Sequence, residues 1–182
     1  MANEELQVLT VGHSTLSAEA FGELLTAHRI KTLVDVRSFP GSRRYPQFNK
    51  SALSEYLAAS QVSYVHAPLL GGRRQPHADS HNTAWRNASF RAYADYMETE
   101  NFKQGVSELL ELARNERIAI MCAESLWWRC HRSLISDYLK SIGVEVDHIL
   151  GTKKTESHRY TAAARIVDGE LSYRGLLDEE DV

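Results

Sequence analysis

The segment between residues 122 and 132 concentrates side chains that can do chemistry. It holds both cysteines of the chain together with one carboxylate, one histidine and two arginines, namely Cys122, Glu124, Arg129, Cys130, His131 and Arg132. A thiolate can act as a nucleophile, and a carboxylate or an imidazole can donate or accept a proton. Guanidinium groups bind phosphates and carboxylates. The residue types therefore predict a site that binds an anion and carries candidates for nucleophilic or acid–base catalysis.

The elements on either side of this segment predict where it lies in the fold. Residues 117–121 form a short apolar run typical of a buried strand, and residues 133–142 carry apolar side chains at helical spacing. The segment is therefore predicted to turn from the carboxyl end of a strand into the amino end of a helix. Ligands bind at such turns in open α/β proteins, because a helix start offers free N–H groups and a positive dipole end.

Other predicted strands also end in polar residues. Three apolar, β-branched runs predict strands, at residues 6–11, 30–36 and 62–66. The polar residues at or just after their carboxyl ends are His13, Asp35, Arg37 and His66. The carboxyl ends of parallel strands share one edge of a sheet, so we expect these residues to meet the 122–132 segment there. Above all, we expect one pocket open to water to be shared by His13, Asp35, Glu124 and Arg132.

The alternation of strands and helices predicts the fold class. Helices with one apolar face are expected after residues 17, 49 and 89 and at 102–113, and a last core strand at 144–149. Ser17 and Ser89 are the predicted N-caps of two of these helices. Together the elements indicate a single α/β domain, a mainly parallel sheet flanked by helices, with the site at the carboxyl ends of the strands. We expect this domain to cover residues 1–150.

Residues 151–182 are expected to form a C-terminal extension. The dipeptide Asp168-Gly169 favours a tight turn, so residues 166–171 predict a small hairpin. Four acids, at positions 178–181, close the chain as an acidic tail and contribute to its formal net charge of −3.

Arginines collect in the predicted loops although the chain is acidic overall. Those expected to bind substrate are Arg37, Arg43, Arg44, Arg73, Arg129 and Arg132. The long irregular stretch from Ala67 to about Ala88 is interpreted as an ordered lid that excludes water. Its Trp85, or alternatively Trp127 or Trp128, is expected to stack on a base. This pattern favours an anion-binding cleft, and its other interpretation is a set of solvated loop arginines.

Length and composition fit a globular protein. The chain has 182 residues, of which 43% are hydrophobic and 25% are charged. No apolar run approaches the roughly 20 residues that span a bilayer, and the first residues lack the pattern of a secretory signal. Two cysteines without such a signal indicate a reducing compartment, so we expect a cytoplasmic protein. No sequence feature indicates the oligomeric state.

Five short motifs follow one another along residues 7–150. They are Thr10-Val11-Gly12-His13-Ser14, Leu33-Val34-Asp35-Val36-Arg37-Ser38-Phe39-Pro40, Pro46-Gln47-Phe48-Asn49-Lys50, Leu70-Gly71-Gly72-Arg73, and Cys122-Ala123-Glu124 with Cys130-His131-Arg132-Ser133. In these motifs the chain closely resembles the DUF488 family, bacterial and archaeal proteins of unassigned function. The resemblance covers nearly the whole expected domain and supports a site at these motifs, but it implies no reaction.

The first enzymatic interpretation is a thiolate nucleophile acting on an anionic substrate. Cys130 lies at a predicted helix start beside Arg129 and Arg132, which would lower the pKa of its thiol. Cys122 is the reserve nucleophile, and a buried, unreactive thiol is the other interpretation for it. The layout is similar to the loops of rhodaneses and tyrosine phosphatases. The spacing differs, because the phosphatase pattern would place arginine at position 128, which is Trp.

Two further interpretations use other groups. Asp35 and Glu124 could act as acid and base on a nucleotide-like substrate, with His13 and His131 orienting groups or carrying protons. The simpler alternative is that Asp35 only pairs with an arginine. A metal could be held by the two cysteines with His13 and His131, but Cys-x7-Cys-His lacks the short spacing of structural zinc sites. We therefore expect no metal and no cofactor.

These interpretations lead to one hypothesis and one alternative. The chain is expected to be a hydrolase or transferase acting on an anionic, nucleotide- or nucleic-acid-like substrate. Its catalytic candidates are Asp35, Cys122, Glu124, His13 and His131. The alternative is a non-catalytic module that binds nucleic acid or a nucleotide through the same arginines. The expected partner is thus an anionic small molecule or a nucleic acid, and not a membrane.

Overall fold

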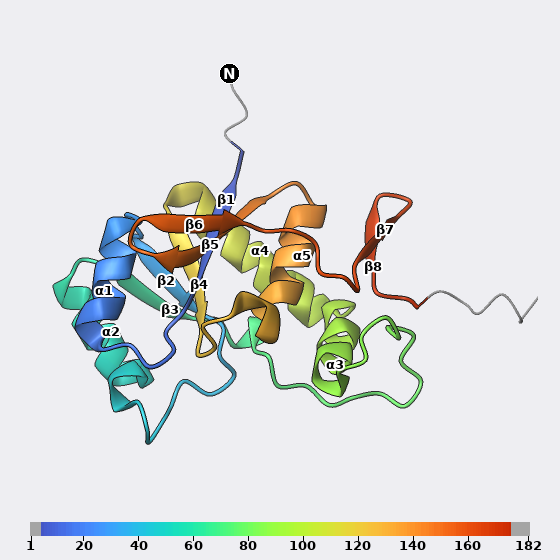
Figure 1. Cartoon of the computed structure of the whole chain (residues 1–182), viewed down its shortest axis with the longest axis horizontal. Coiled ribbons are helices and arrows are strands. Elements are labelled where there is room, and N and C mark those ends of the chain that lie inside the picture. The colour runs from blue at the N-terminus through green and yellow to red at the C-terminus, as the bar shows by residue number, and fades with distance from the viewer. Residues whose placement is uncertain (1–4, 176–182) are drawn as a thin grey trace, which may run out of the picture.

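A six-stranded, mostly parallel sheet forms the centre of the computed structural model, which describes residues 5–175 (Figure 1). Its strands are β1 (Gln7–Gly12), β2 (Thr32–Asp35), β3 (Ser63–His66), β4 (Ile118–Cys122), β5 (Glu145–Gly151) and β6 (Lys154–Ser157). They lie in the order β3-β2-β4-β1-β5-β6, and the pairs from β3 to β5 are parallel. The final pair, β5 with β6, is antiparallel.

Helices connect the parallel strands. In the described residues they are α1 (Ala18–Ala27), α2 (Lys50–Ala59), α3 (Ala88–Met97), α4 (Glu100–Asn115) and α5 (Arg132–Ser141). Three 3-10 turns stand in the connections: η1 (Pro46–Phe48), η2 (Pro68–Leu70) and η3 (Trp127–Arg129). The predicted fold class, an α/β domain with a mainly parallel sheet flanked by helices, is confirmed.

The two faces of the sheet bury two separate apolar clusters. On β1, Val8 faces the cluster formed with α3, α4 and α5, whereas Leu9 faces the cluster formed with α1 and α2. Side chains alternate across a strand, so both faces of β1 are apolar, as a sheet covered on both sides requires. This explains why the central strands are continuous apolar runs in the sequence.

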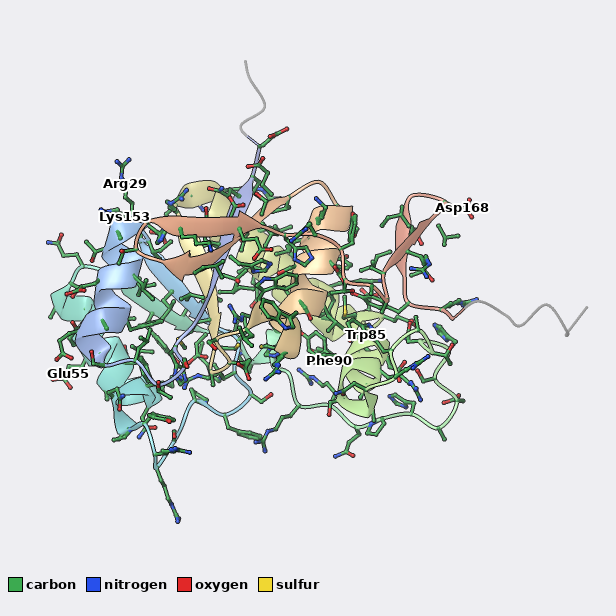
Figure 2. All side chains as sticks on the ribbon, viewed as in Figure 1. Arg29, Glu55, Trp85, Phe90, Lys153 and Asp168 are labelled. Carbon is green, nitrogen blue, oxygen red and sulfur yellow. The ribbon has the colours of Figure 1, made fainter. Side chains whose placement is uncertain are left out.

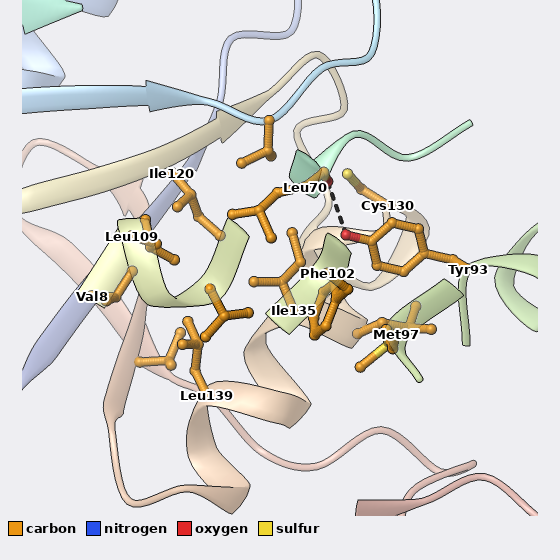
Figure 3. Close-up of a cluster of buried hydrophobic side chains, with 14 of the residues drawn as sticks. Val8, Leu70, Tyr93, Met97, Phe102, Leu109, Ile120, Cys130, Ile135 and Leu139 are labelled. Carbon is orange, nitrogen blue, oxygen red and sulfur yellow. Dashed lines mark hydrogen bonds between the residues drawn. The ribbon is translucent and has the colours of Figure 1, made fainter. Parts of the chain in front are cut away.

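The cluster under α3, α4 and α5 reaches the candidate site (Figure 3). Tyr93 of α3 is buried, and its hydroxyl donates a hydrogen bond of 2.8 Å to the carbonyl of Leu70 in η2. Cys130 belongs to the same cluster and lies beside this tyrosine in the view. The core therefore holds the start of the irregular stretch after β3 close to the start of α5.

The helix starts confirm one predicted cap and correct the other. The hydroxyl of Ser17 accepts a hydrogen bond from the N–H of Ala20, as expected for the N-cap of α1. The N-cap of α3 is Asn87, whose side chain accepts from the N–H groups of Ser89 and Phe90. The prediction of Ser89 as the N-cap is wrong, because the helix begins at Ala88, two residues before Phe90, the first apolar residue of the predicted pattern.

The C-terminal stretch contains one predicted and one unpredicted pair of strands. The hairpin β7 (Arg165–Val167) with β8 (Glu170–Ser172) turns at Asp168 and Gly169, whose φ angles of 52° and 83° suit the predicted tight turn. Strand β6 extends the main sheet and was not predicted. The acids at positions 178–181 lie outside the described residues.

No helix in the described part of the chain is both long and apolar enough to cross a bilayer.

Gly12, at the end of β1, offers a test of how tightly the site is built. A Cβ atom there would lie 1.9 Å from the carbonyl oxygen of Glu124. We expect Gly12→Ala to lower the free energy of unfolding by at least about 2 kcal/mol, because backbone must move to relieve the clash. Gly41→Ala is the matched control, since a Cβ at Gly41 meets nothing within 4 Å. Equal urea midpoints for the two variants would contradict the close approach.

Candidate functional site

A cleft of about 620 Å³ lies where β1, β2 and β4 end and α5 begins. Seven of the predicted site residues line it, namely His13, Arg37, Arg73, Cys122, Glu124, Arg129 and His131. Cys130, Ser38, Phe39 and Phe90 also contribute to its walls. The cleft stands at the sheet edge at which we expected the site.

Two thiols touch at the floor of the cleft. The Sγ atoms of Cys122 and Cys130 lie 2.7 Å apart, and both residues are buried and free of a disulfide. Cys122 ends β4, and Cys130 stands two residues before α5. The intervening turn brings these residues, eight positions apart in the sequence, into contact.

The two thiols have opposite acidities. Burial raises the pKa of the Cys122 thiol well above its ordinary value, and the contact with Cys130 adds to this effect. Burial alone would also raise the pKa of Cys130. However, hydrogen bonding from Cys122 and the charges of His131 and Arg132 outweigh burial and hold that pKa well below its ordinary value. These directions favour Cys130 as the thiolate of the pair.

His131 is oriented by the backbone to face this thiolate. Its Nε2 lies 2.9 Å from the carbonyl oxygen of Val36, which can only accept, so Nε2 carries a proton. Its Nδ1 lies 3.4 Å from Cys130 Sγ and can receive the thiol proton. A Cβ on Gly72 would lie 2.5 Å from the same Nδ1, so the Gly71-Gly72 motif lets this loop close over the imidazole.

Arg132 lies beneath the cleft and not in it. The guanidinium is buried, with Nε donating to Cys122 Sγ at 3.0 Å. Its two terminal nitrogens donate to Thr10 Oγ1 at 3.1 Å and to the carbonyl oxygen of Glu124 at 2.5 Å. All of its donating nitrogens are thus directed at protein atoms. Arg132 shapes the turn after β4 and orients the Cys122 thiol, and its predicted place among exposed anion-binding groups is not observed.

Asp35 is likewise buried beneath the cleft. Its carboxylate accepts hydrogen bonds from Arg37 Nε and Nη2, at 2.9 and 2.7 Å, and from the Tyr64 hydroxyl at 2.5 Å. Burial and this carboxylate raise the pKa of Tyr64 above its ordinary value. The arrangement matches the simpler interpretation, in which Asp35 pairs with an arginine. The expected shared pocket open to water therefore includes His13 and Glu124 but neither Asp35 nor Arg132.

His13 connects this ion pair to the cleft. Its Nδ1 lies 2.9 Å from the carbonyl oxygen of Ser14 and donates to it, while Nε2 faces Arg37 Nη1 at 3.4 Å and accepts from it. Burial lowers the pKa of His13, and the charges of Arg37 and Arg132 act in the same direction. The ring also stacks on Phe48, with centroids 4.1 Å apart. His13 is therefore a neutral, fixed imidazole.

Glu124 and two arginines form the solvent-facing rim. Glu124 is half-buried, and its Oε1 accepts from the N–H of Leu126 at 3.2 Å. Arg73 and Arg129 are exposed and line the cleft. Arg37 is already paired with Asp35, so Arg73 and Arg129 against Glu124 leave an excess of one positive charge, which favours a bound anion.

The remaining predicted substrate-binding residues lie elsewhere. Arg43 and Arg44 are exposed next to the cleft without lining it, and Arg44 lies over the ring of Tyr45. Trp85 lines a separate groove and packs against Phe90, whose ring centroid lies 5.0 Å away (Figure 2). Composition and spacing placed these residues in the right loops, but they do not determine on which side of a loop a side chain lies.

A buried chain of polar side chains extends from Arg132 and was not predicted. Thr10 Oγ1 lies 2.7 Å from His148 Nδ1, His148 Nε2 lies 2.9 Å from His158 Nδ1, and His158 Nε2 lies 2.9 Å from Asp137 Oδ1. Burial, with the neighbouring His158 and Arg132, lowers the pKa of His148 to about 2. No sequence signal indicates these contacts, because their members are far apart in the chain.

Among the described residues, no group of three or more His, Cys, Asp or Glu side chains is arranged to hold a metal ion.

The buried ion pair yields a stability prediction. Asp35→Asn leaves the Arg37 guanidinium without its counter-charge, so we expect a loss of about 3–5 kcal/mol in the free energy of unfolding. Asp147→Asn on β5 is the control, because Asp147 is only partly buried and binds neutral partners. Urea titrations measure both, and a loss for Asp35→Asn no larger than for the control would contradict the structural role.

The chain matches one family model, described as a domain of unknown function, DUF488, over residues 17–139. No curated protein and no solved structure matches the chain. The match includes Asp35, Arg37, Arg73 and the whole segment from Cys122 to Arg132. It covers more than half of the sequence and includes four of the five motifs, whereas the first, at residues 10–14, lies just before it. The chain therefore belongs to the DUF488 family.

Proposed function

We propose that this chain is a hydrolase or transferase that uses the Cys130 thiolate as its nucleophile on an anionic, nucleotide-like substrate. The observation that carries the proposal is the contact between Cys130 Sγ and His131 Nδ1 at the floor of a cleft with three arginines. A thiolate beside an imidazole, at the start of a helix, is the arrangement in which cysteine is an active nucleophile.

The surroundings of Cys130 support a two-step reaction. The thiolate attacks the electrophilic atom of the substrate, forming a bond to sulfur while the bond to the leaving group breaks. The imidazolium of His131 gives its Nδ1 proton to the leaving group. Water or another acceptor then attacks the intermediate, His131 Nδ1 takes up the proton of that nucleophile, and the thiolate is regenerated.

The arginines supply the binding energy for the anion. Arg37 is held rigidly by Asp35 and reaches the cleft beside His13, so it is already oriented before the substrate arrives. Arg73 and Arg129 are exposed and can close on the anion from the rim. Glu124 is the remaining carboxylate of the cleft and serves as a further proton acceptor for the attacking water or other nucleophile.

The paired-carboxylate mechanism has less support. Asp35 is buried and its oxygens are held by Arg37 and Tyr64, so it has no free access to a substrate. Glu124 alone remains at the cleft. Such a mechanism needs two carboxyl groups that can both reach the substrate, and only one is accessible here.

Replacement of Cys130 tests the proposed function. We expect Cys130→Ala to lower turnover of a responsive nucleoside phosphate by at least about a thousandfold while changing its Kd by less than about twofold. In wild type, iodoacetamide should label Cys130 rapidly at about pH 6.5, since its lowered pKa keeps the thiolate present there. Cys122→Ala is the control: Cys130 should still be labelled, but only at higher pH, because the contact with Cys122 that helps to lower its pKa is lost. Binding of nucleoside phosphates without turnover by wild type would identify the alternative, a non-catalytic module.

A second candidate function is dithiol–disulfide exchange, which the 2.7 Å contact between the two Sγ atoms favours. The Cys130 thiolate would attack one sulfur of a small disulfide and release a thiolate. Cys122 would then lose its proton and attack Cys130 Sγ, releasing the second thiol. The substrate disulfide gains two electrons, and the protein pair becomes a disulfide that a dithiol reductant reopens.

Oxidised glutathione provides the test of this exchange. We expect wild type to lose about 2 Da, equivalent to two hydrogens, and to recover them with dithiothreitol. Cys122→Ser should instead retain glutathione as a mixed disulfide on Cys130, because the resolving thiol is missing. Intact-mass measurement distinguishes the two products. A stable mixed disulfide on the wild-type protein would contradict resolution by Cys122.

A further inference from the structure

A second concave surface borders the cleft, and we call it the aromatic groove. It encloses about 900 Å³, and its principal lining residues are Trp85, Phe90, Trp127, Trp128 and Tyr160 with Arg86, Arg159, Arg165 and Arg174. The turn after β4 forms part of both walls, because Trp127 and Trp128 line the groove whereas Glu124, Arg129 and Cys130 line the cleft. Phe90 lines both. The groove and the cleft are therefore neighbours that share one wall.

The charge of the aromatic groove is one-sided. Four arginines line it, and no Asp or Glu does among the described residues. Arg159 contacts Glu156 at 3.1 Å, but its side chain is 84% exposed, so this pair adds little. Arg165 donates to the backbone carbonyls of Ala162 and Ala164 and forms no ion pair with any of residues 5–175. Such a surface attracts a polyanion.

The groove also presents aromatic faces to solvent. Trp128 is 50% exposed and Tyr160 is 37% exposed, so part of each ring is accessible to a ligand. Trp127 is held rigidly by stacking on His148, with ring centroids 4.3 Å apart. The indole N–H groups of Trp85 and Trp127 are buried without an acceptor in the described part of the chain. Exposed rings on a fixed support are suited to stacking on a planar ligand.

We propose that the aromatic groove binds single-stranded nucleic acid and directs it toward the cleft. Phosphates would pair with the arginines, and unpaired bases would stack on Trp128 and Tyr160. A duplex hides the faces of its bases, and an acidic peptide satisfies the arginines but leaves the rings without a stacking partner. The path into the cleft follows from Phe90, which both surfaces share.

This proposal rests on the proposed function only for what happens after binding. If the substrate of Cys130 is nucleotide-like, the groove makes that substrate an oligonucleotide and not a mononucleotide. Binding in the groove does not itself require a reactive thiol, so the two proposals can fail separately.

The test uses a fluorescently labelled single-stranded DNA oligonucleotide, its RNA equivalent, the matching DNA duplex and AMP. We expect the full chain to bind a single strand, DNA or RNA, at least about tenfold more tightly than the duplex or AMP. Log Kobs should fall linearly with log salt, by about 0.7 for each phosphate neutralised. Equal binding of duplex or of AMP, or no binding of either single strand at low salt, would overturn the proposal.

Variants then locate the binding surface. Arg165→Gln with Arg174→Gln should lower the affinity at least about tenfold and reduce the salt slope by about 1.4, because two phosphate contacts are lost. The matched control removes two exposed charges elsewhere, by Arg114→Gln with Lys153→Gln, and should change neither quantity. Figure 2 shows Lys153 far from Trp85. If the control pair weakens binding as much as the groove pair, attraction is non-specific and the groove is not the site.

Stacking is tested at Trp128. Trp128→Ala should weaken single-strand binding about tenfold, and Trp128→Phe should restore most of it, because a ring is again present. An unchanged affinity for Trp128→Ala would overturn the stacking role. Cys130→Ala should bind the single strand as wild type does. If Cys130→Ala binds the single strand as wild type does and wild type does not turn the oligonucleotide over, the proposed binding site in the groove is supported while the proposed function fails.

Discussion

The structure around the cleft depends on one buried cation, the guanidinium of Arg132. It is among the largest fully buried side chains, and no carboxylate within the described residues forms a salt bridge with it. A buried charge must be compensated by hydrogen bonds and by nearby negative charge. Here the backbone carbonyl of Glu124, the Thr10 hydroxyl and the Cys122 sulfur accept from it. Cys130, whose lowered pKa favours a thiolate, lies in contact with Cys122 and is the group suited to supply the negative charge.

The polar chain behind Arg132 explains how this cation is held in place. Asp137 accepts from the Thr161 and Tyr173 hydroxyls as well as from His158, so it is an ionised acceptor. His158 must then donate through Nε2, and each earlier member donates to the next, back to the Arg132 guanidinium. Because every hydrogen bond in this series donates in the same direction, from Arg132 toward Asp137, the tautomers of both histidines are fixed. It also links the C-terminal stretch, through Thr161 and Tyr173, to the thiol pair.

The residues that support the site are buried, and the residues that can meet a substrate line the cleft. Asp35 and Arg132 are buried and orient other groups, whereas Arg37, His131 and Cys130 reach the cleft. One buried pair, Asp35 with Arg37, fixes an arginine for the anion. One buried cation, Arg132, contacts the Cys122 thiol and helps to lower the pKa of Cys130. The proposed chemistry thus arises from charges placed below the surface, and the aromatic groove adds a binding surface above it.

Local sequence patterns determined the elements and their order. Apolar runs predicted the five parallel strands, helical spacing predicted the helices, and the polar residues at strand ends predicted the edge at which the cleft lies. These features depend on neighbours in the chain. Tertiary packing decided the remainder: that Asp35 and Arg132 lie beneath the cleft, that the Cys122 and Cys130 thiols touch, that Trp85 faces a separate groove, and that β6 extends the sheet. Burial and contacts between distant residues depend on the packed whole, so residue type and spacing alone do not reveal them.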